Sequence, residues 1–223
     1  MNESLNMQTY KDFKKDIMTF ALKPGDYVSA AKIAERYNVS RTPAREALVK
    51  LETEGLVDIY PQSRSVISKI DIRRAKQEWF IRRTLEMGTV DALFEKVTPE
   101  GIAQMREYSA KMIKVSQEAK SHESAYLYLT YDNEFHGTTY KIAGQFLAAE
   151  TISNTMAHYN RIRLLTDLDN FYKNRTLTAH EQLIQFLEEG NKEAYRGLLD
   201  KHLGYITQDI EDMRRDNPAI FKE

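Results

Sequence analysis

Up to about residue 70, hydrophobic residues recur every three to four positions over short stretches, a spacing typical of amphipathic helices. The first stretch covers residues 10–20 and stops before Pro24 and Gly25, which are strong turn signals. A second short stretch covers residues 30–37 and stops at Asn38. The pattern therefore predicts two short helices in succession, separated by turns.

A third helix and a hairpin are predicted next. Ser40 and Thr42 are both N-cap candidates, Pro43 fits a first helical turn, and Gly55 marks the end of the apolar face that begins at Ala44. Two β-rich runs, 56–60 and 65–70, then flank a short polar turn. Helix, turn, second helix and hairpin is the order of a winged helix-turn-helix domain, which we place at residues 1–70.

After residue 70 the periodicity changes to long helices. One covers residues 71–97, and Thr98 with Pro99 forms a cap and first-turn pair for the next. Further helices are expected at about 122–143, 145–166, 170–189 and 191–214. The predicted fold is mainly α: the winged domain is followed, over residues 71–223, by an all-α antiparallel bundle of about six helices.

Composition narrows the class of protein. The chain has 223 residues, of which 42% are hydrophobic and 29% charged, and no apolar run approaches membrane-spanning length. The N-terminal residues lack the cationic and apolar pattern of a signal peptide, and the chain has no cysteine. We expect a globular, cytoplasmic protein that has no membrane partner, no disulfide and no thiolate metal site.

The third predicted helix carries DNA-binding chemistry. Arg41 and Arg45 are four residues apart and share a face, and a guanidinium can bond the O6 and N7 atoms of guanine. Ser40 and Thr42, at the helix N-terminus, can bond phosphates. The tip of the predicted wing adds three further DNA-binding candidates, namely Gln62, Ser63 and Arg64.

The charge balance indicates how such a domain would act. The chain has a net charge of −1, and residues 1–70 hold 11 Lys and Arg against 9 Asp and Glu. One copy would therefore bind DNA weakly, whereas a homodimer doubles the phosphate contacts and matches a pseudo-palindromic, double-stranded operator. The alternative is that Arg41, Arg45 and Arg64 are solvated surface charges on a small helical domain.

Three segments of this region, residues 22–26, 33–48 and 51–57, closely resemble the N-terminal domain of GntR-family transcription regulators. The most specific of them reads IAERYNVSRTPAREAL. The resemblance implies that Ser40, Arg41, Thr42 and Arg45 occupy DNA-contact positions. One departure lies in the wing, where the family often has glycine and this chain has Arg64.

Four histidines, His136, His158, His180 and His202, recur at intervals of 22 residues. Each helical residue advances the chain by ~1.5 Å, so about ten residues before a turn and ten after it return an antiparallel helix pair to the same height in the bundle. Asp132 and His136 also share a helical face. Asp132, His136, His180 and His202 form a three-nitrogen, one-oxygen set suited to Zn or Ni. Alternatively, each histidine is a surface or hydrogen-bonded core residue.

The second region resembles the FadR C-terminal (FCD) subfamily, on the segment Arg82-Arg83-Thr84-Leu85-Glu86, the Asp132-x-x-x-His136 pair and the later His180 and His202. The resemblance implies that Asp132, His136, His180 and His202 hold a divalent transition metal. Arg82 matches a cavity-facing arginine that would bind a small carboxylate effector, although a plain Arg82–Glu86 pair is an equal alternative. His158 lies outside the ligand pattern. We group it with Arg82 at the effector site, and contact with the metal or its ligands is the alternative.

Three functions remain open from the sequence. The leading hypothesis is a transcription regulator, expected to be a repressor and not an enzyme, whose metal and carboxylate effector modulate operator binding. A metal-dependent hydrolase is the alternative, because a site of three histidines and one aspartate can activate water. A third possibility is a bundle that serves only for dimerisation. No nucleotide-binding glycine motif is present in the sequence.

Overall fold

The computed structural model describes residues 4–60, 64–166 and 170–222. The chain forms two compact units. The first consists of Met1–Ile72 together with Asn217–Glu223, and the second consists of Arg73–Asp216.

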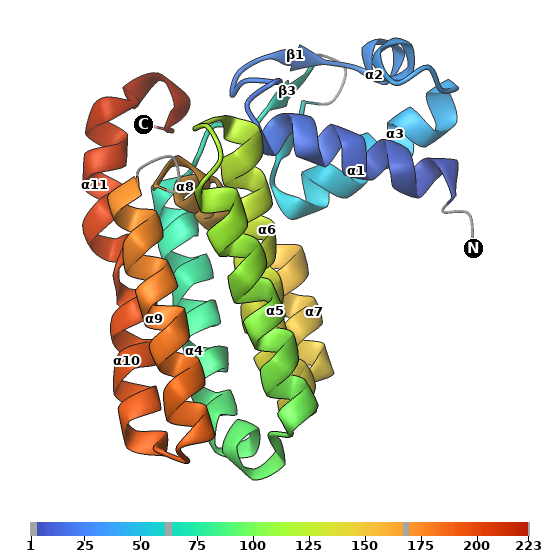
Figure 1. Ribbon diagram of the computed structural model, residues 1–223. Coiled ribbons are helices and arrows are strands. Elements are labelled where there is room, and N and C mark those ends of the chain that lie inside the picture. The colour runs from blue at the N-terminus through green and yellow to red at the C-terminus, as the bar shows by residue number, and fades with distance from the viewer. Residues whose placement is uncertain (1–3, 61–63, 167–169, 223) are drawn as a thin grey trace. The chain divides into compact units, whose positions relative to one another are not determined.

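Three helices and a small antiparallel sheet form the first unit (Figure 1). The elements are α1 (Leu5–Met18), β1 (Tyr27–Val28), α2 (Ala30–Arg36), α3 (Arg41–Glu54), β2 (Val57–Ile59) and β3 (Ser65–Ile67), and the sheet order is β1-β3-β2. The predicted helices and the β2–β3 hairpin are confirmed. The sequence does not predict β1, because two residues are too few to show an alternating pattern.

Local sequence sets both ends of α3. Ser40 is the N-cap residue and has an extended backbone, while Gly55 adopts a left-handed conformation with φ of 81° that ends the helix. Ala44, Ala47 and Leu51 are buried, on the side of α3 that packs against α1 and α2. The polar residues of the first two turns consequently face outward.

The last residues of the chain belong to the first unit. Ile70 pairs with Phe221 in a parallel bridge, and the Ile70 amide donates to the Ile220 carbonyl oxygen at 2.9 Å. The short 3-10 helix η1 (Pro218–Ile220) precedes this pairing. The predicted boundary at residue 70 puts this segment with the helical part, because a pairing between residues so far apart leaves no signal in local periodicity.

Long helices build the second unit, in which α5 packs on both α6 and α9, and α10 packs on α9 (Figure 1). Its helices are α4 (Ile72–Lys96), α5 (Pro99–Ser116), α6 (His122–Ala143), α7 (Phe146–Thr155), α8 (Ala157–Thr166), α9 (Asn170–Glu188), α10 (Lys192–Gly204) and α11 (Ile206–Asp216). None of the helices in the described ranges is long and apolar enough to cross a bilayer.

The expected number of about six helices in this part is wrong, since eight are present among the described residues. The stretch 145–166 is divided at Met156, and the stretch 191–214 is divided at Tyr205. No proline marks either break, so the apolar periodicity continues across both and reads as one helix.

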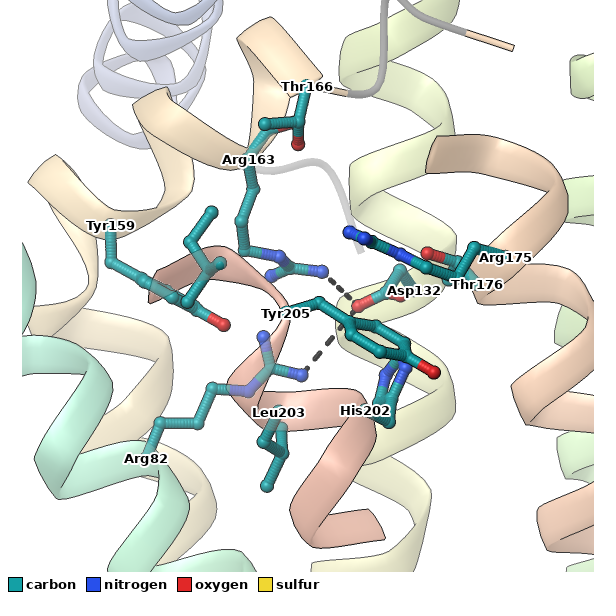
Figure 2. Close-up of a pocket in the computed structure, with 11 residues that line it drawn as sticks. Arg82, Asp132, Tyr159, Arg163, Thr166, Arg175, Thr176, His202, Leu203 and Tyr205 are labelled. Atoms are coloured by element: carbon teal, nitrogen blue, oxygen red, sulfur yellow. Dashed lines mark hydrogen bonds and ion pairs between the residues drawn. The ribbon is translucent and has the colours of Figure 1, made fainter. Parts of the chain in front are cut away.

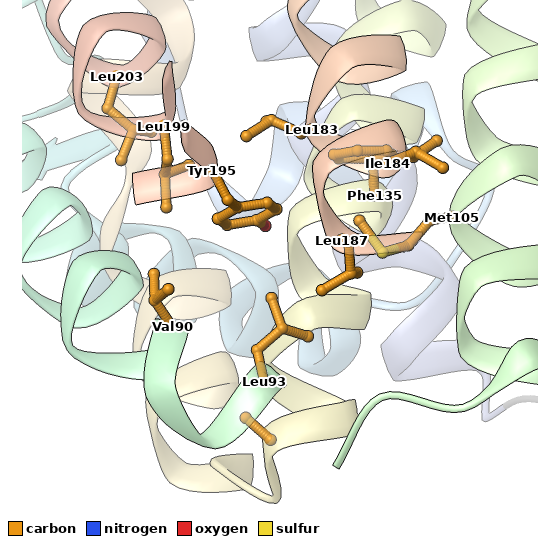
Figure 3. Packing of buried hydrophobic residues seen from close by; sticks show 11 residues of the cluster. Val90, Leu93, Met105, Phe135, Leu183, Ile184, Leu187, Tyr195, Leu199 and Leu203 are labelled. Atoms are coloured by element: carbon orange, nitrogen blue, oxygen red, sulfur yellow. The ribbon is translucent and has the colours of Figure 1, made fainter. Parts of the chain in front are cut away.

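A hydrophobic core with residues from five helices, α4, α5, α6, α9 and α10, lies inside the second unit (Figure 3). Phe135, Leu183 and Ile184 are fully buried in it, and Leu199 and Leu203 of α10 pack into the same cluster. Burying a Leu or Ile side chain contributes ~1.5–3 kcal/mol each. The cluster therefore fixes α6, α9 and α10 against one another, and these helices carry the histidines considered next.

Candidate functional site

The outer face of α3 presents the predicted DNA-reading side chains. Ser40, Arg41, Thr42 and Arg45 are all exposed. Neither the Arg41 nor the Arg45 side chain has a hydrogen bond or ion pair with any residue that the structure describes. Both guanidiniums are therefore available to an external acceptor.

The N-terminus of α3 also offers a polar group that has no partner in the helix. The Ser40 side chain makes no capping hydrogen bond to the helix, unlike Ser29 of α2, whose hydroxyl accepts from the Lys32 amide at 3.3 Å. The exposed Ser40 hydroxyl thus lies at the positive end of the helix dipole without a bond to the helix. This arrangement is suited to a phosphate group.

At the wing, Arg64 is exposed, and its carbonyl oxygen accepts a hydrogen bond from the Tyr60 amide at 2.9 Å, which closes the hairpin. The other two wing candidates, Gln62 and Ser63, lie outside the described residues.

Four predicted ligands converge inside the second unit. Asp132 and His136 project from α6, His180 from α9 and His202 from α10. His136 Nε2 lies 3.2 Å from both His180 Nε2 and His202 Nε2. Asp132 Oδ1 lies 3.5 Å from His180 Nε2, and Asp132 Oδ2 lies 3.9 Å from His136 Nε2. One potential ligand atom from each residue is within 4.8 Å of the others.

The separations between the imidazole nitrogens fit a single ion. Ligand atoms at ~2.1 Å from a metal, with angles between octahedral and tetrahedral values, are about 3.0–3.4 Å apart. The two His–His distances of 3.2 Å fall in this range. The donor set of three imidazole nitrogens and one carboxylate oxygen is also a common one for divalent transition metals. The residues present therefore fit a metal ion.

The protonation of the cluster favours a cation as well. Burial lowers the pKa of His180 well below its ordinary value, and burial together with the neighbouring His136 lowers the pKa of His202 to about 3. Burial alone would raise the pKa of Asp132, but the positive charges of the neighbouring guanidiniums of Arg163 and Arg82 outweigh it and hold that pKa low. Neutral imidazoles beside an ionised carboxylate are the forms that bind metal.

A small cavity lies next to the cluster and is lined by polar side chains (Figure 2). It has a volume of about 50 Å³, and its lining residues are Arg82, Asp132, Tyr159, Arg163, Thr166, Arg175, Thr176, His202, Leu203, Tyr205 and Ile206. Arg163 hydrogen-bonds Asp132 Oδ2, and Arg82 Nη2 lies 3.7 Å from the same oxygen (Figure 2). The cavity thus combines three arginines with two of the candidate metal ligands.

Both interpretations of Arg82 describe part of its environment. Arg82 Nε donates to Glu86 Oε1 at 2.6 Å, as in the plain helical pair, and its guanidinium also lines the cavity. His158 is buried on α8 and is not among the residues that line this cavity, whereas its neighbour Tyr159 is.

Four side chains of the site were not predicted from the sequence. Tyr159, Arg163, Arg175 and Tyr205 line the cavity, and the Arg175 guanidinium stacks on the Tyr205 ring at 4.0 Å. Tyr159 and Arg163 are four residues apart on α8 and so share a helix face. This spacing would indicate a cavity lining only if that face were already known to be turned toward the interior.

Comparisons with known proteins agree with this architecture. The family model for bacterial regulatory proteins of the gntR family matches residues 5–67, and the FCD domain model matches residues 79–205. The HTH-type transcriptional repressor RspR of Escherichia coli is 27% identical over 221 residues, which cover 99% of this chain and 95% of that protein. An uncharacterized HTH-type regulator from Streptomyces ambofaciens is 27% identical over 212 residues, covering 95% and 87%.

A solved structure, that of Escherichia coli McbR/YncC, matches with a TM-score of 0.77 over 96% of this chain and 99% of that chain, at 21% identity. This likeness shows the fold, and it confirms the predicted combination of a winged helix-turn-helix domain and a helical domain. With the FCD model matching more than half of the sequence and the gntR model matching the N-terminal part, the chain belongs to the GntR family of bacterial transcription regulators, in the group whose second part is an FCD domain.

Proposed function

We propose that this regulator binds a divalent transition metal through Asp132, His136, His180 and His202, and that a small carboxylate bound beside the metal modulates operator binding. The observation that carries the proposal is the convergence of three imidazole nitrogens and one carboxylate from three helices. Zn and Ni both suit this donor set. The ion would supply a fixed positive charge at the inner end of the cavity.

The cavity supports a carboxylate as the effector. Arg82, Arg163 and Arg175 all line it, and the Tyr159 ring lies 5.6 Å from the Arg82 guanidinium and 5.4 Å from that of Arg163. Guanidinium groups bind carboxylates bidentately, and a metal beside them adds to the attraction. Because α4, which carries Arg82, follows the first unit directly in the chain, a shift of this helix on ligand binding would reach the DNA-binding part.

For the DNA-binding part, we assign base reading to Arg41 and Arg45, phosphate contacts to Ser40 and Thr42, and a wing contact to Arg64. Recognition would be by a homodimer on a pseudo-palindromic operator, because the small positive charge of one domain is a weak basis for affinity. Phe146 and Leu147, which are adjacent on α7 and 68% and 76% exposed, offer an apolar surface for contact with a second copy. A repressor role follows the printed name of RspR.

The test combines metal analysis with DNA binding by the full-length protein. We expect about one metal ion per chain in the wild type and its loss in the His180→Ala/His202→Ala double variant. Fluorescence anisotropy on the promoter next to the gene should show tight, sequence-specific binding that small carboxylates change only when metal is present. Equal metal content in the two proteins would contradict the metal site. Turnover of an ester or amide that stops on chelation would instead support the hydrolase alternative.

A further inference from the structure

Glu86 links the polar cavity to the four candidate metal ligands. It lies on α4 with 3% exposure, and its two oxygens have different partners. Glu86 Oε2 lies 2.7 Å from His136 Nδ1, while Oε1 accepts from Arg82 Nε at 2.6 Å. The carboxylate is thus fixed between a cavity-lining guanidinium and one of the four candidate metal ligands.

The contact with Glu86 determines how His136 is protonated. A carboxylate paired with a buried guanidinium is ionised and only accepts hydrogen bonds, so the Nδ1 atom of His136 must be the donor. The lone pair of the other ring nitrogen, Nε2, is then left for an ion, and Nε2 is the atom that faces the other ligands. Glu86 therefore selects the form of the ring that can coordinate metal.

The other two histidines lack such support. The Nδ1 atoms of His180 and His202 are buried and have no hydrogen-bond partner within the described part of the chain. His180 is held instead by ring stacking on Phe135. Among the three imidazoles, His136 is accordingly the one whose orientation a carboxylate controls, and it lies 3.2 Å from each of the other two.

We propose that Glu86 is a positioning residue, which binds no metal itself but fixes the tautomer and the ring orientation of His136 and so sets the affinity of the metal site. This inference rests on the proposed function. Arg82 has a supporting part, because its guanidinium compensates the charge of a carboxylate that is otherwise removed from water. The Arg82–Glu86 pair, whose helical spacing is visible in the sequence, is thus one part of a series of hydrogen bonds that runs from the cavity to His136.

The test is the Zn²⁺ affinity of the full-length Glu86→Gln variant, measured by competition with a chromophoric chelator. The amide of glutamine can donate to Nδ1 and so favour the tautomer with its proton on Nε2. We expect Zn²⁺ binding to weaken by about 10–100-fold, the usual effect of losing such a hydrogen-bonded partner. Unchanged affinity would overturn the proposal.

Glu78→Gln is the matched control. Glu78 lies two turns earlier on α4 and is 4% exposed, and it also accepts hydrogen bonds, from Arg74 Nε at 3.0 Å and from the Tyr159 amide at 2.8 Å. It contacts none of the four candidate ligands. Zn²⁺ affinity should remain at the wild-type value in this variant, which separates positioning of His136 from the general effect of neutralising a buried glutamate on this helix.

Nitrogen-15 NMR of the Zn²⁺-loaded wild-type protein tests the same point without a mutation. We expect His136 to carry its proton on Nδ1, with a strongly downfield proton resonance, and to bind the metal through Nε2. Metal on Nδ1, or a solvent-exchanging Nδ1 proton, would overturn the proposal even if Glu86→Gln fails to fold. A wild-type protein that takes up no Zn²⁺ contradicts the proposed function itself, whereas equal uptake by wild type and Glu86→Gln contradicts only the role of Glu86.

Discussion

His136 Nε2 and His180 Nε2 lie 3.2 Å apart, although 44 residues separate the two histidines in the chain. Their helices, α6 and α9, are held at this level by the shared core that includes Phe135 and Leu183. The ring of Phe135 stacks on that of His180, with centroids 4.0 Å apart and planes within 3°. The apolar packing thus sets the geometry of the polar cluster.

We therefore predict that Phe135→Ala weakens both the fold and the metal site. Removing a fully buried phenylalanine costs about 3–5 kcal/mol of unfolding free energy. The same change removes the surface against which His180 is stacked, so Zn²⁺ affinity should fall by about tenfold or more, as expected when the shell around a metal site is disturbed. Urea unfolding and Zn²⁺ competition titration measure the two effects.

Leu187→Ala is the control for that prediction. Leu187 is buried in the same cluster, two turns after His180 on α9. Its truncation should cost about 2–5 kcal/mol of stability and leave Zn²⁺ affinity unchanged, because Leu187 supports the helix and does not support the ring. An equal loss of affinity in both variants would mean that the site responds to stability in general and not to the Phe135 stack.

The sequence predicts the parts of this protein that depend on local pattern. Gly55 ends α3, Thr98 caps α5, and the helical spacing of Asp132 and His136 places both on one face of α6. The spacing of 22 residues also brings His180 and His202 to one level, since α9 and α10 form a hairpin around Gly190.

Features that depend on tertiary contacts are not visible in the same way. Arg163 reaches Asp132 from α8, and the break at Met156 that ends α7 has no proline or glycine to mark it. Tyr159 lines the cavity and the adjacent His158 does not, which shows the same limit, because one residue of helical phase decides which side chain faces the cavity. The separate start of α8 sets that phase.

Arg45 allows a direct test of the DNA-reading face. We predict that Arg45→Ala lowers affinity for the specific operator by about 1–3 kcal/mol, or about 5–150-fold, because a bidentate guanidinium–guanine contact is lost. Affinity for unrelated DNA should change much less, since non-specific binding depends on phosphate contacts and not on base edges. Anisotropy titrations with specific and scrambled duplexes at one fixed salt concentration give both numbers.

Arg106→Ala is a suitable comparison. Arg106 is also half-exposed but lies on α5 in the second unit, where it pairs with Glu188 at 2.7 Å. Loss of one positive charge there should leave operator affinity unchanged. A similar decrease in both variants would show that the effect of Arg45 is one of overall charge and not of base reading.

The stability of the metal-free protein should decrease on mild acidification because of the buried histidines. The pKa of His202 is about 3 in the folded protein, against about 6.5 in an unfolded chain. Between these values the unfolded state binds more protons, so the stability is fully present above about pH 6.5 and is lost as the pH falls toward 3. His180, whose pKa is also lowered by burial, acts in the same direction.

Each such histidine contributes a slope of up to about 1.4 kcal/mol per pH unit. We expect urea unfolding of the metal-free protein between pH 6.5 and 5 to show this decline, above the range in which Asp132 and Glu86 are protonated. His202→Asn should reduce this slope by up to about 1.4 kcal/mol per pH unit, which corresponds to one proton, because one buried imidazole no longer has to be charged. The Nδ1 atom of His202 is buried although the residue as a whole is partly exposed, and an unchanged slope would show that water reaches the ring in the folded state.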